Sequence, residues 1–341
     1  MVLILNICTF PTIRFGLRTD EKVSILMPVR NEVDILPLTL PLLLAQPADE
    51  ILVLDDESSD GSSQLLAEAS NNNIRLRVVK GTPLPKGWGG KNWACHQLAK
   101  LAQGEILIFT DADVFWKEGA LGAILSFRKA QGAGLLSVWP LQKVESVLER
   151  IAVPQLDVIL LGGLPQLGAK HLPLDSLVAA NGQMMMWTRE AYWKSGGHVS
   201  VKNLVLEDVS LARRAKASGQ LVALALGAQV LQTRMYRRSK DLIEGFAKSI
   251  LPAAGHVSFL FIILILSALS YTLSWGLVIF EERWLLVCLL GLGLRILVDL
   301  KVGRNPMWLW LQPIAPIVVW FISLYALNKR GSYTWKGRNY P

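Results

Sequence analysis

The first 110 residues alternate between short apolar runs and helical stretches, and this alternation limits the fold more than any other feature of the chain. Apolar runs occupy 23–28, 50–55, 75–79 and 105–110, while helical stretches follow the first run as far as Gln46 and cover 91–102. Strands joined by helices in this way form a parallel sheet with helices on both faces. The sequence therefore predicts an α/β fold with a mainly parallel sheet.

Three short segments with charged residues lie at the carboxyl ends of these runs, where each strand is expected to end. They are Pro28-Val29-Arg30-Asn31-Glu32, Asp55-Asp56 and Asp111-Ala112-Asp113. In parallel sheets ligands bind beyond the carboxyl ends of the strands, so we expect these residues to share one crevice. No glycine fingerprint of a dinucleotide site follows the first strand, which weighs against NAD or FAD.

Asp111 and Asp113 are two residues apart, so both carboxylates can face the same side of an extended strand end. Mg²⁺ and Mn²⁺ prefer oxygen ligands, and Mg²⁺ is usually held by one or two carboxylates together with substrate phosphates. We predict that Asp113 binds such a metal, and that Asp111 contacts either a ribose or the metal through water. A pair of turn or capping aspartates is the alternative.

The Asp55-Asp56 pair can be interpreted in two ways. Ser58, Ser59 and Asp60 follow it directly, which is the composition of a turn and a helix cap. A carboxylate that accepts hydrogen bonds from a base or a ribose is the functional alternative. Both interpretations can be correct, one for each aspartate, because successive side chains of a strand point in opposite directions.

A second acidic signature, Leu206-Glu207-Asp208, precedes a helical stretch at 208–218 that closes at Gly219. The amino end of a helix favours an ionised carboxylate by about 0.3–1 kcal/mol. This suits Asp208 as a general base, with Glu207 beside it, provided that it lies within hydrogen-bond reach of the proton it takes. A helix-capping role for this pair is the alternative.

Residues 84–91 (Leu-Pro-Lys-Gly-Trp-Gly-Gly-Lys) form a glycine-rich loop that runs into a helix. Glycines permit close backbone approach and a helix start favours anions, so Lys91 is expected to contact phosphate or sugar. Trp88 suggests a lid or a contact with the acceptor. The spacing is not that of a P-loop, and a flexible surface loop is the alternative.

Further polar residues are candidate contacts of the acceptor or the diphosphate. Gln183 and His198 lie in the glycine-containing segments 181–183 and 196–198, although an isolated histidine is more often an ordinary loop residue. Arg234, Arg237 and Arg238 could pair with a departing diphosphate. They could equally be the positive flank of a membrane segment.

Apolar residues make up 52% of the chain and concentrate after His256, in the stretches 257–280, 284–300 and 307–327. A membrane span needs about 20 apolar residues. The first stretch meets this length; the second is shorter and carries Arg295 and Asp299, so it spans only if these groups face protein or reach an interface. The third is interrupted by Pro313 and Pro316, as re-entrant helices are.

The net charge of +8 arises from 35 basic and 27 acidic residues, and basic residues flank the apolar region on both sides. The positive-inside rule then predicts that both flanks are cytoplasmic, with an even number of crossings between them. We expect the third stretch to be the one that does not cross. No nucleic-acid-binding motif accompanies the positive charge, and three scattered cysteines indicate neither disulfides nor a zinc site.

Four regions are expected from these patterns. Residues 1–20 are expected to form an interfacial anchor, or the remnant of a longer segment if the chain starts upstream, and 21–255 a catalytic domain. Residues 256–328 are expected to form membrane-associated helices, and 329–341 a basic cytoplasmic tail. The catalytic domain is expected on the cytoplasmic side of the cell membrane.

With these residues in view, the chain resembles the family-2 inverting glycosyltransferases of GT-A fold. It is most similar to membrane-attached enzymes that glycosylate lipids, namely bacterial carotenoid and hopanoid-associated glycosyltransferases and, more distantly, ceramide glucosyltransferase. The matching segments are 28–32, Asp55-Asp56 with 58–60, 84–88 with Gly90-Lys91, 111–113, 196–198, 206–208, and Trp335-Lys336-Gly337-Arg338 with Tyr340. The segment at 84–91 and the C-terminal one are more restricted in distribution than the others.

The resemblance implies binding of a nucleotide sugar, with UDP favoured, at a site that includes Pro28, Glu32, Asp55 or Asp56, Lys91 and Asp111. It also implies a metal at Asp113, Asp208 as the base, and contacts from Trp335 and Arg338. Polysaccharide synthases carry a Gln-x-x-Arg-Trp motif, whereas this chain reads Gln232-Thr-Arg-Met-Tyr236, which argues against polymer synthesis. The expected reaction is transfer of a hexose, with glucose favoured, to a lipid hydroxyl. Transfer to polyprenyl phosphate or to a glycero- or sphingolipid, and an inactive membrane scaffold, are the alternatives.

Overall fold

The computed structural model describes residues 1–17, 19–329, 333–335 and 338–340. These residues form two compact units, which we describe separately. One unit, here called the sheet unit, comprises residues 9–141 and 164–233. The other, here called the helical unit, comprises residues 1–8, 142–163 and 234 to the C-terminus.

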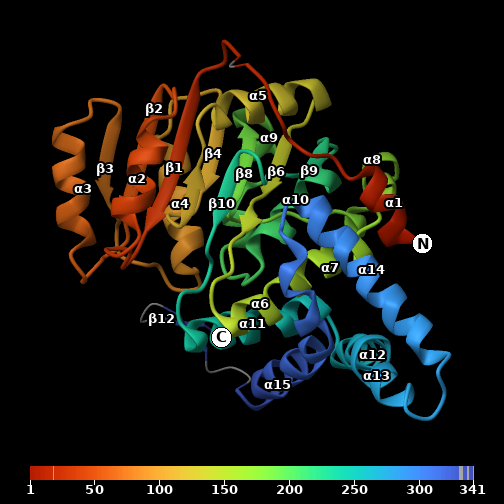
Figure 1. Ribbon diagram of the computed structural model, residues 1–341. Helices are drawn as coiled ribbons and strands as arrows, with labels where there is room; N and C mark the ends of the chain where they lie inside the picture. Colours follow the sequence, from red (N-terminus) through yellow and green to blue (C-terminus); the bar gives the residue numbers. More distant parts are fainter. Residues whose placement is uncertain (18, 330–332, 336–337, 341) are drawn as a thin grey trace. The chain divides into compact units, whose positions relative to one another are not determined.

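The sheet unit is built on a seven-stranded sheet with the strand order β3-β2-β1-β4-β8-β6-β9 (Figure 1). All neighbouring strands pair in parallel except β8, which is antiparallel to both β4 and β6. The predicted α/β fold with a mainly parallel sheet is therefore confirmed. The strands are β1 Val23–Val29, β2 Glu50–Asp55, β3 Leu76–Lys80, β4 Ile106–Thr110, β6 Leu135–Trp139, β8 Met184–Thr188 and β9 Val222–Leu226.

Helices cover both faces of this sheet, and the central strand β1 explains why. Ile25 packs with α2, α3 and α5 residues in one hydrophobic cluster, whereas the next residue, Leu26, packs with α4 and α10 residues in another. Because successive side chains of a strand point to opposite faces, an unbroken apolar run is buried on both. The helices are α2 Leu36–Leu44, α3 Ser62–Asn71, α4 Gly90–Leu101, α5 Ala120–Gln131, α8 Gln166–His171, α9 Arg189–Lys194 and α10 Glu207–Ala217.

The antiparallel direction of β8 determines which segment lies beside the end of β4. Met184, the first residue of β8, pairs with Thr110, the last residue of β4. The segment before β8 therefore lies beside the carboxyl end of β4, directly next to Asp111.

The remaining elements of the sheet unit are short. The 3₁₀ turns η1 Asp175–Leu177 and η2 Gly197–Val201 precede β8 and α10. A second sheet contains β5 Val114–Trp116, which pairs antiparallel with β10 Leu231–Thr233, and it also includes β7 Leu141–Gln142.

The helical unit consists of helices and one short hairpin. Its elements are α1 Val2–Thr9, α6 Val147–Ala152, α7 Pro154–Gly163, α11 Ser239–Ala254, α12 Val257–Ala268, η3 Leu269–Leu273, α13 Ser274–Leu277, α14 Trp284–Val302, η4 Pro306–Ile314, α15 Ala315–Asn328, β11 Tyr333–Trp335 and β12 Arg338–Tyr340. Within it, Asn6 of α1 donates a 2.8 Å hydrogen bond from its side-chain amide to the Leu161 carbonyl of α7. The predicted boundaries at 20, 255 and 328 remain predictions.

Two helical segments in the described part of the chain are long and apolar enough to cross a membrane: Val257–Leu277 and Pro306–Asn328. By length and composition these are the first and third apolar stretches, whereas we expected the third to be the one that does not cross. The second, α14, contains Arg295, Asp299 and Lys301, which lower its apolar character. The result is weak evidence for membrane association.

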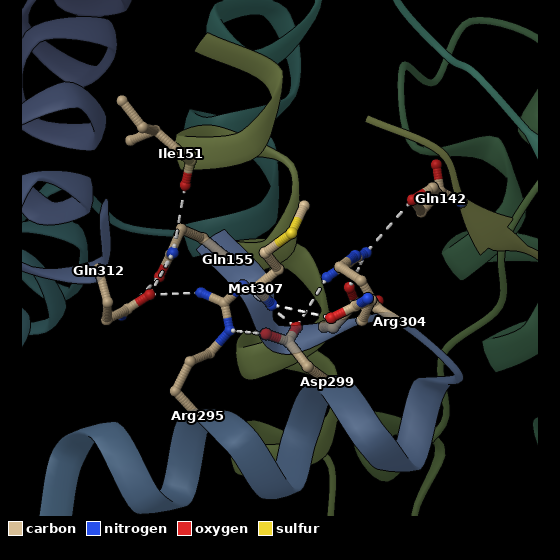
Figure 2. Close-up of polar contacts among 10 residues, drawn as sticks. Gln142, Ile151, Gln155, Arg295, Asp299, Arg304, Met307 and Gln312 are labelled. Carbon is tan, nitrogen blue, oxygen red and sulfur yellow. Dashed lines mark hydrogen bonds and ion pairs between the residues drawn. The ribbon is translucent and has the colours of Figure 1, made fainter. Parts of the chain in front are cut away.

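Arg295 and Asp299 belong to a buried polar network (Figure 2). The Arg295 guanidinium donates two hydrogen bonds of 3.1 Å to the Asp299 carboxylate, and a further one to the Gln312 side chain of η4. Arg304 also binds Asp299, at 3.1 Å, and forms a 2.6 Å ion pair with Asp157 of α7. The condition set by the sequence for α14, that its charged groups face protein, is therefore met.

Candidate active site

Hydrogen bonds join the loops that follow β1 and β2 at the carboxyl edge of the sheet. The backbone N–H groups of Asn31, Glu32 and Val33 donate to the side chains of Ser58, Ser62 and Asp60, at 3.1, 2.8 and 3.0 Å respectively. Asn31 has a φ of 53°, which side-chain-bearing residues rarely adopt. Backbone strain of this kind persists where the surroundings enforce it, and it clusters at functional sites.

Asp55 has the turn-stabilising contacts that its sequence context allowed. Its carboxylate accepts a 3.0 Å hydrogen bond from the Ser58 backbone N–H and another from the Ser63 hydroxyl. Asp56 is buried, and its backbone N–H donates to the Val29 carbonyl at 2.8 Å. A base or ribose contact through either residue, or through Pro28 or Glu32, remains a prediction.

Lys91, in the first turn of α4, joins the two acidic signatures. Its ammonium lies 2.8 Å from the Asp111 carboxylate, 3.3 Å from the Glu207 carboxylate and 3.4 Å from the Gly182 carbonyl. Burial opposes the charged form of Lys91, but Asp111 and Glu207 outweigh it and hold its pKa well above the usual value. The two signatures are 96 residues apart in sequence (207 − 111) and meet at one cation.

Asp208 lies next to this bridge, in the first turn of α10. One of its carboxylate oxygens accepts a 2.8 Å hydrogen bond from the Gly182 N–H, and the other accepts one of 2.8 Å from the Val209 N–H. Burial and the neighbouring Glu207 carboxylate raise the pKa of Asp208 to about 6, although these N–H groups and Lys91 act in the opposite direction. Such a carboxylate is a stronger base than an ordinary aspartate and is still ionised at neutral pH.

The segment 181–183 connects the two sides of the site. The Asp111 N–H donates a 3.1 Å hydrogen bond to the Gln183 carbonyl, and the Asn181 side-chain oxygen accepts 2.8 Å from the Gln183 N–H. Gln183 is itself buried, and its side-chain amide donates to Thr233 at 3.4 Å. The sequence drew attention to this segment without predicting its structural role. Because β8 is antiparallel to β4, the segment lies beside Asp111 and contacts both Asp111 and Asp208.

The aromatic residues near the glycine-rich loop pack against one another. The Trp88 ring lies 5.0 Å from that of Trp93 and 5.3 Å from that of His96, measured between centroids. His96 in turn lies next to Trp193, which is partly exposed, with the two ring centroids 6.3 Å apart. Trp88 precedes α4 and packs against two residues of that helix, and its contact with an acceptor stays a prediction.

His198 is a buried residue of the η2 turn. Its Nδ1 lies 2.8 Å from the Tyr192 hydroxyl, and its ring packs against Phe109 with centroids 4.8 Å apart. Burial and the positive charge of Lys91 lower the pKa of His198 to about 3, so the ring is neutral at physiological pH. This geometry is that of a core histidine that supports the η2 turn.

The remaining candidates belong to the helical unit. Arg234 forms ion pairs with Glu149 of α6, at 2.9 Å, and with Glu145, while Arg237 and Arg238 are exposed. Trp335 and Arg338 are paired in the backbone register of the β11–β12 hairpin. Lys336 and Gly337 lie outside the described residues. A role for any of these residues near a diphosphate stays a prediction.

Asp111 and Asp113 are the predicted ligands of a donor-linked metal. They lie in the short connection between β4 and β5, at the carboxyl edge of the sheet. Within the described residues no group of three or more His, Cys, Asp or Glu side chains could hold a metal ion alone. A metal at Asp111 and Asp113 stays a prediction.

The fold of this chain is similar to that of a solved enzyme. A solved mannosyltransferase from Pyrobaculum calidifontis, in complex with GDP-Man and Mn²⁺, matches 96% of this chain and 93% of its own with a TM-score of 0.58 and 15% sequence identity. At this identity the likeness concerns the fold alone, and the predicted GT-A-like α/β fold is confirmed.

The sequence then places the chain in a family. The profile of Glycosyl transferase family 2 matches residues 24–193, and the chain belongs to this family. The 4,4'-diaponeurosporenoate glycosyltransferase of Staphylococcus haemolyticus is 29% identical over 243 residues, which cover 70% of this chain and 63% of the relative. The enzyme of the same name from Staphylococcus aureus strain USA300 is 27% identical, with coverages of 69% and 62%. The matched region thus spans less than two thirds of either relative.

Proposed function

We propose that this protein is an inverting glycosyltransferase that moves a hexose from a nucleotide sugar to a hydroxyl group of a lipid. Glucose, a UDP-linked donor and a carotenoid or related terpenoid acceptor are favoured. The observation that carries the proposal is the Lys91 bridge, which brings the donor-side carboxylate Asp111 and the Glu207-Asp208 pair to one place. The reaction needs both sets of groups at the same anomeric carbon.

On the donor side, Asp111 and Asp113 would hold Mg²⁺ or Mn²⁺, which when bound neutralises the charge of the diphosphate leaving group. Lys91 would be a second cation for the diphosphate, and its ammonium lies 3.1 Å from a carboxylate oxygen of Asp111. The hydrogen-bonded segments at the ends of β1 and β2, which contain Glu32 and Asp55-Asp56, would hold the nucleoside.

On the acceptor side, Asp208 would act as the base. It takes the proton of the acceptor hydroxyl while the oxygen forms a bond to the anomeric carbon, and the bond from that carbon to the diphosphate oxygen breaks. The raised pKa of Asp208 supports this role, because a base with a pKa closer to the working pH has a larger driving force for the proton. The Gly182 N–H orients the carboxylate.

A carboxylate acceptor is a second candidate, because the names of the relatives contain diaponeurosporenoate, a carboxylate. Transfer to a carboxylate forms an ester and needs no base, since the nucleophile is already ionised. The two candidates therefore differ in their dependence on Asp208. A membrane location, with the sheet unit on the cytoplasmic side, would place either lipid acceptor within reach.

The test is the Asp208→Asn variant, assayed with UDP-glucose and a carotenoid that carries either a hydroxyl or a carboxyl end group. Loss of transfer to the hydroxyl, with donor affinity retained, is expected if Asp208 is the base. Retained transfer to the carboxyl compound alone would favour ester formation. Full activity of the variant on the hydroxyl acceptor would overturn the assignment of Asp208.

Mass spectrometry of lipid extracts identifies the acceptor class. Extracts are compared between cells that express the protein and cells that express the Asp208→Asn variant. A terpenoid that is one hexose heavier, found only with the wild-type protein, is the expected result. A sugar added to polyprenyl phosphate or to a glycero- or sphingolipid would assign another acceptor, and unchanged lipids with no turnover of sugar nucleotides would indicate an inactive scaffold.

A further inference from the structure

Asn92, the residue after Lys91 in α4, is buried at 3% exposure and faces the turn that precedes Glu207. Its side-chain amide nitrogen lies 2.9 Å from the Val201 carbonyl, 3.3 Å from the Lys202 carbonyl and 3.2 Å from the Leu204 carbonyl. An amide group carries two N–H donors and suits a site where several carbonyl oxygens converge. One side-chain amide thus binds three backbone carbonyl oxygens of the 201–204 turn.

The loop before α4 contacts the same turn. The Gly89 N–H donates a 2.6 Å hydrogen bond to the Lys202 carbonyl. Gly89 is also the residue that precedes α4, with a φ of −77°. The 201–204 turn is therefore held from two nearby positions at the start of one helix.

Only two residues, Val205 and Leu206, separate this turn from the Glu207-Asp208 pair. Helix α10 starts at Glu207, and the preceding residue, Leu206, provides no side-chain cap. The direction in which α10 starts, and with it the place of the Asp208 carboxylate, depends on how the turn is held. Displacement of a catalytic group by about 1 Å can cost on the order of 100-fold in rate.

We propose that Asn92 is a positioning residue for the transfer reaction: by holding the 201–204 turn, it places Asp208 opposite the Lys91–Asp111 side of the site. The inference rests on the proposed function, in which Asp208 is the base. Because Lys91 and Asn92 are consecutive, one helical turn holds both the donor-side carboxylate and the segment that carries the base. No pattern in the sequence pointed to Asn92, since its three partners are more than 100 residues away.

The experiment measures UDP release from UDP-glucose, with water as the acceptor, for Asn92→Ala, Asn92→Asp and the control Gln97→Ala. Gln97 lies on the same helix. Its side-chain oxygen accepts hydrogen bonds from the Thr82 N–H, at 2.9 Å, and from the Thr82 hydroxyl, at 2.8 Å, and its amide donates to the Trp93 carbonyl, so its hydrogen bonds do not involve the 201–204 turn. We expect kcat to fall about 10- to 100-fold for Asn92→Ala, and at least as much for Asn92→Asp, whose carboxylate cannot donate. KM for the donor should change less than about twofold, since the donor side is intact.

A milder pair of variants covers the case in which the Asn92 variants fail to fold. Gly89→Pro removes the N–H that binds the Lys202 carbonyl, at a φ that proline adopts, whereas Gly89→Ala keeps the N–H. A methyl group at Gly89 would lie 3.5 Å from the Asn92 amide and from the Lys202 carbonyl, which is ordinary contact. A lower kcat for the proline variant than for the alanine variant supports the proposal.

The outcomes separate this inference from the proposed function through Asp208→Asn, measured alongside. If Asp208→Asn is inactive while the Asn92→Ala and Gly89→Pro variants retain wild-type kcat, the positioning role is wrong and the base assignment stands. If Asp208→Asn is fully active, the base assignment falls and the positioning role with it. Equal losses in the Asn92 and Gln97 variants would also overturn it, because they would reflect a general loosening of α4.

Discussion

The Gly182 N–H donates a 2.8 Å hydrogen bond to the Asp208 carboxylate, while the carbonyl of the same glycine lies 3.4 Å from the Lys91 ammonium. One peptide segment therefore contacts both the base candidate and the cation that pairs with Asp111. The antiparallel strand β8 brings this segment to the carboxyl edge of β4. The two acidic signatures of the sequence are joined through it.

Gly182 is a position where a side chain is not accommodated freely. A methyl group there would lie 3.3 Å from the Lys91 ammonium and 3.4 Å from the Asp208 carboxylate. We expect Gly182→Ala to displace both groups by a few tenths of an ångström and to lower kcat by about tenfold, with little change in Tm. Steady-state kinetics and thermal unfolding measure this, and a kcat equal to that of the wild type would show that the site tolerates the shift.

The activity is expected to depend on pH through Asp208. Because its pKa is raised to about 6, the carboxylate loses its charge as the pH falls through that value, and kcat for a hydroxyl acceptor should fall with it. The groups that act on this carboxylate are Glu207, Lys91 and the Gly182 and Val209 N–H groups. A pH profile of kcat from about pH 5 to 8 tests the expectation, and a flat profile would contradict it.

The same pKa has a consequence for stability. Folding raises the pKa of Asp208 from 3.8 to about 6, so the folded state favours the protonated form. The stability that folding gains from the protonated Asp208 carboxyl group is fully present below the unfolded pKa of 3.8, and it is lost as the pH rises through about 6. Asp208→Asn should therefore raise Tm more at about pH 8 than at about pH 4. An equal shift at both pH values would indicate that ionisation of Asp208 has no part in it.

The polar network of the helical unit is expected to be important for stability. Asp299 is only 2% exposed and binds both Arg295 and Arg304. Its replacement by Asn leaves two buried guanidinium groups without that charge, and breaking a buried ion pair costs about 3–5 kcal/mol. Thermal unfolding in detergent measures the effect, with Glu281→Gln, which removes the exposed pair with Arg283, as the control that should leave Tm unchanged.

The network also bears on membrane topology. Arg304 follows α14 and pairs with Asp157, and the segment 142–163 that contains Asp157 continues into the sheet unit at both ends. If Val257–Leu277 crosses a membrane, α14 must return the chain to the side on which it started. In a variant without native cysteines, Glu282→Cys should therefore react with an impermeant maleimide in intact cells, and Met307→Cys should not. Labelling of Met307→Cys but not of Glu282→Cys would contradict this arrangement.

Much of the sheet unit could be predicted from local patterns. The strands expected at 50–55 and 105–110 occur at Glu50–Asp55 and Ile106–Thr110, and the helix expected at 208–218 occurs at Glu207–Ala217. The prediction that the residues after these strands meet in one crevice follows from the parallel direction of the strands alone. For the C-terminal region, composition identified the apolar stretches, and which of them cross a membrane stays a prediction.

What the sequence by itself determined is the set of elements and the chemistry at their ends, because burial on one or two faces leaves a local period of apolar residues that can be read directly. Only the tertiary structure decided that β8 runs antiparallel, that Lys91 lies between Asp111 and Glu207, and that Asn92 holds the turn before Asp208. Most of these contacts join residues that are far apart in the chain, and no local pattern encodes the pairing of distant segments. The physical reason is that periodicity records how much of a residue is buried, whereas the identity of its partner depends on how the whole chain packs.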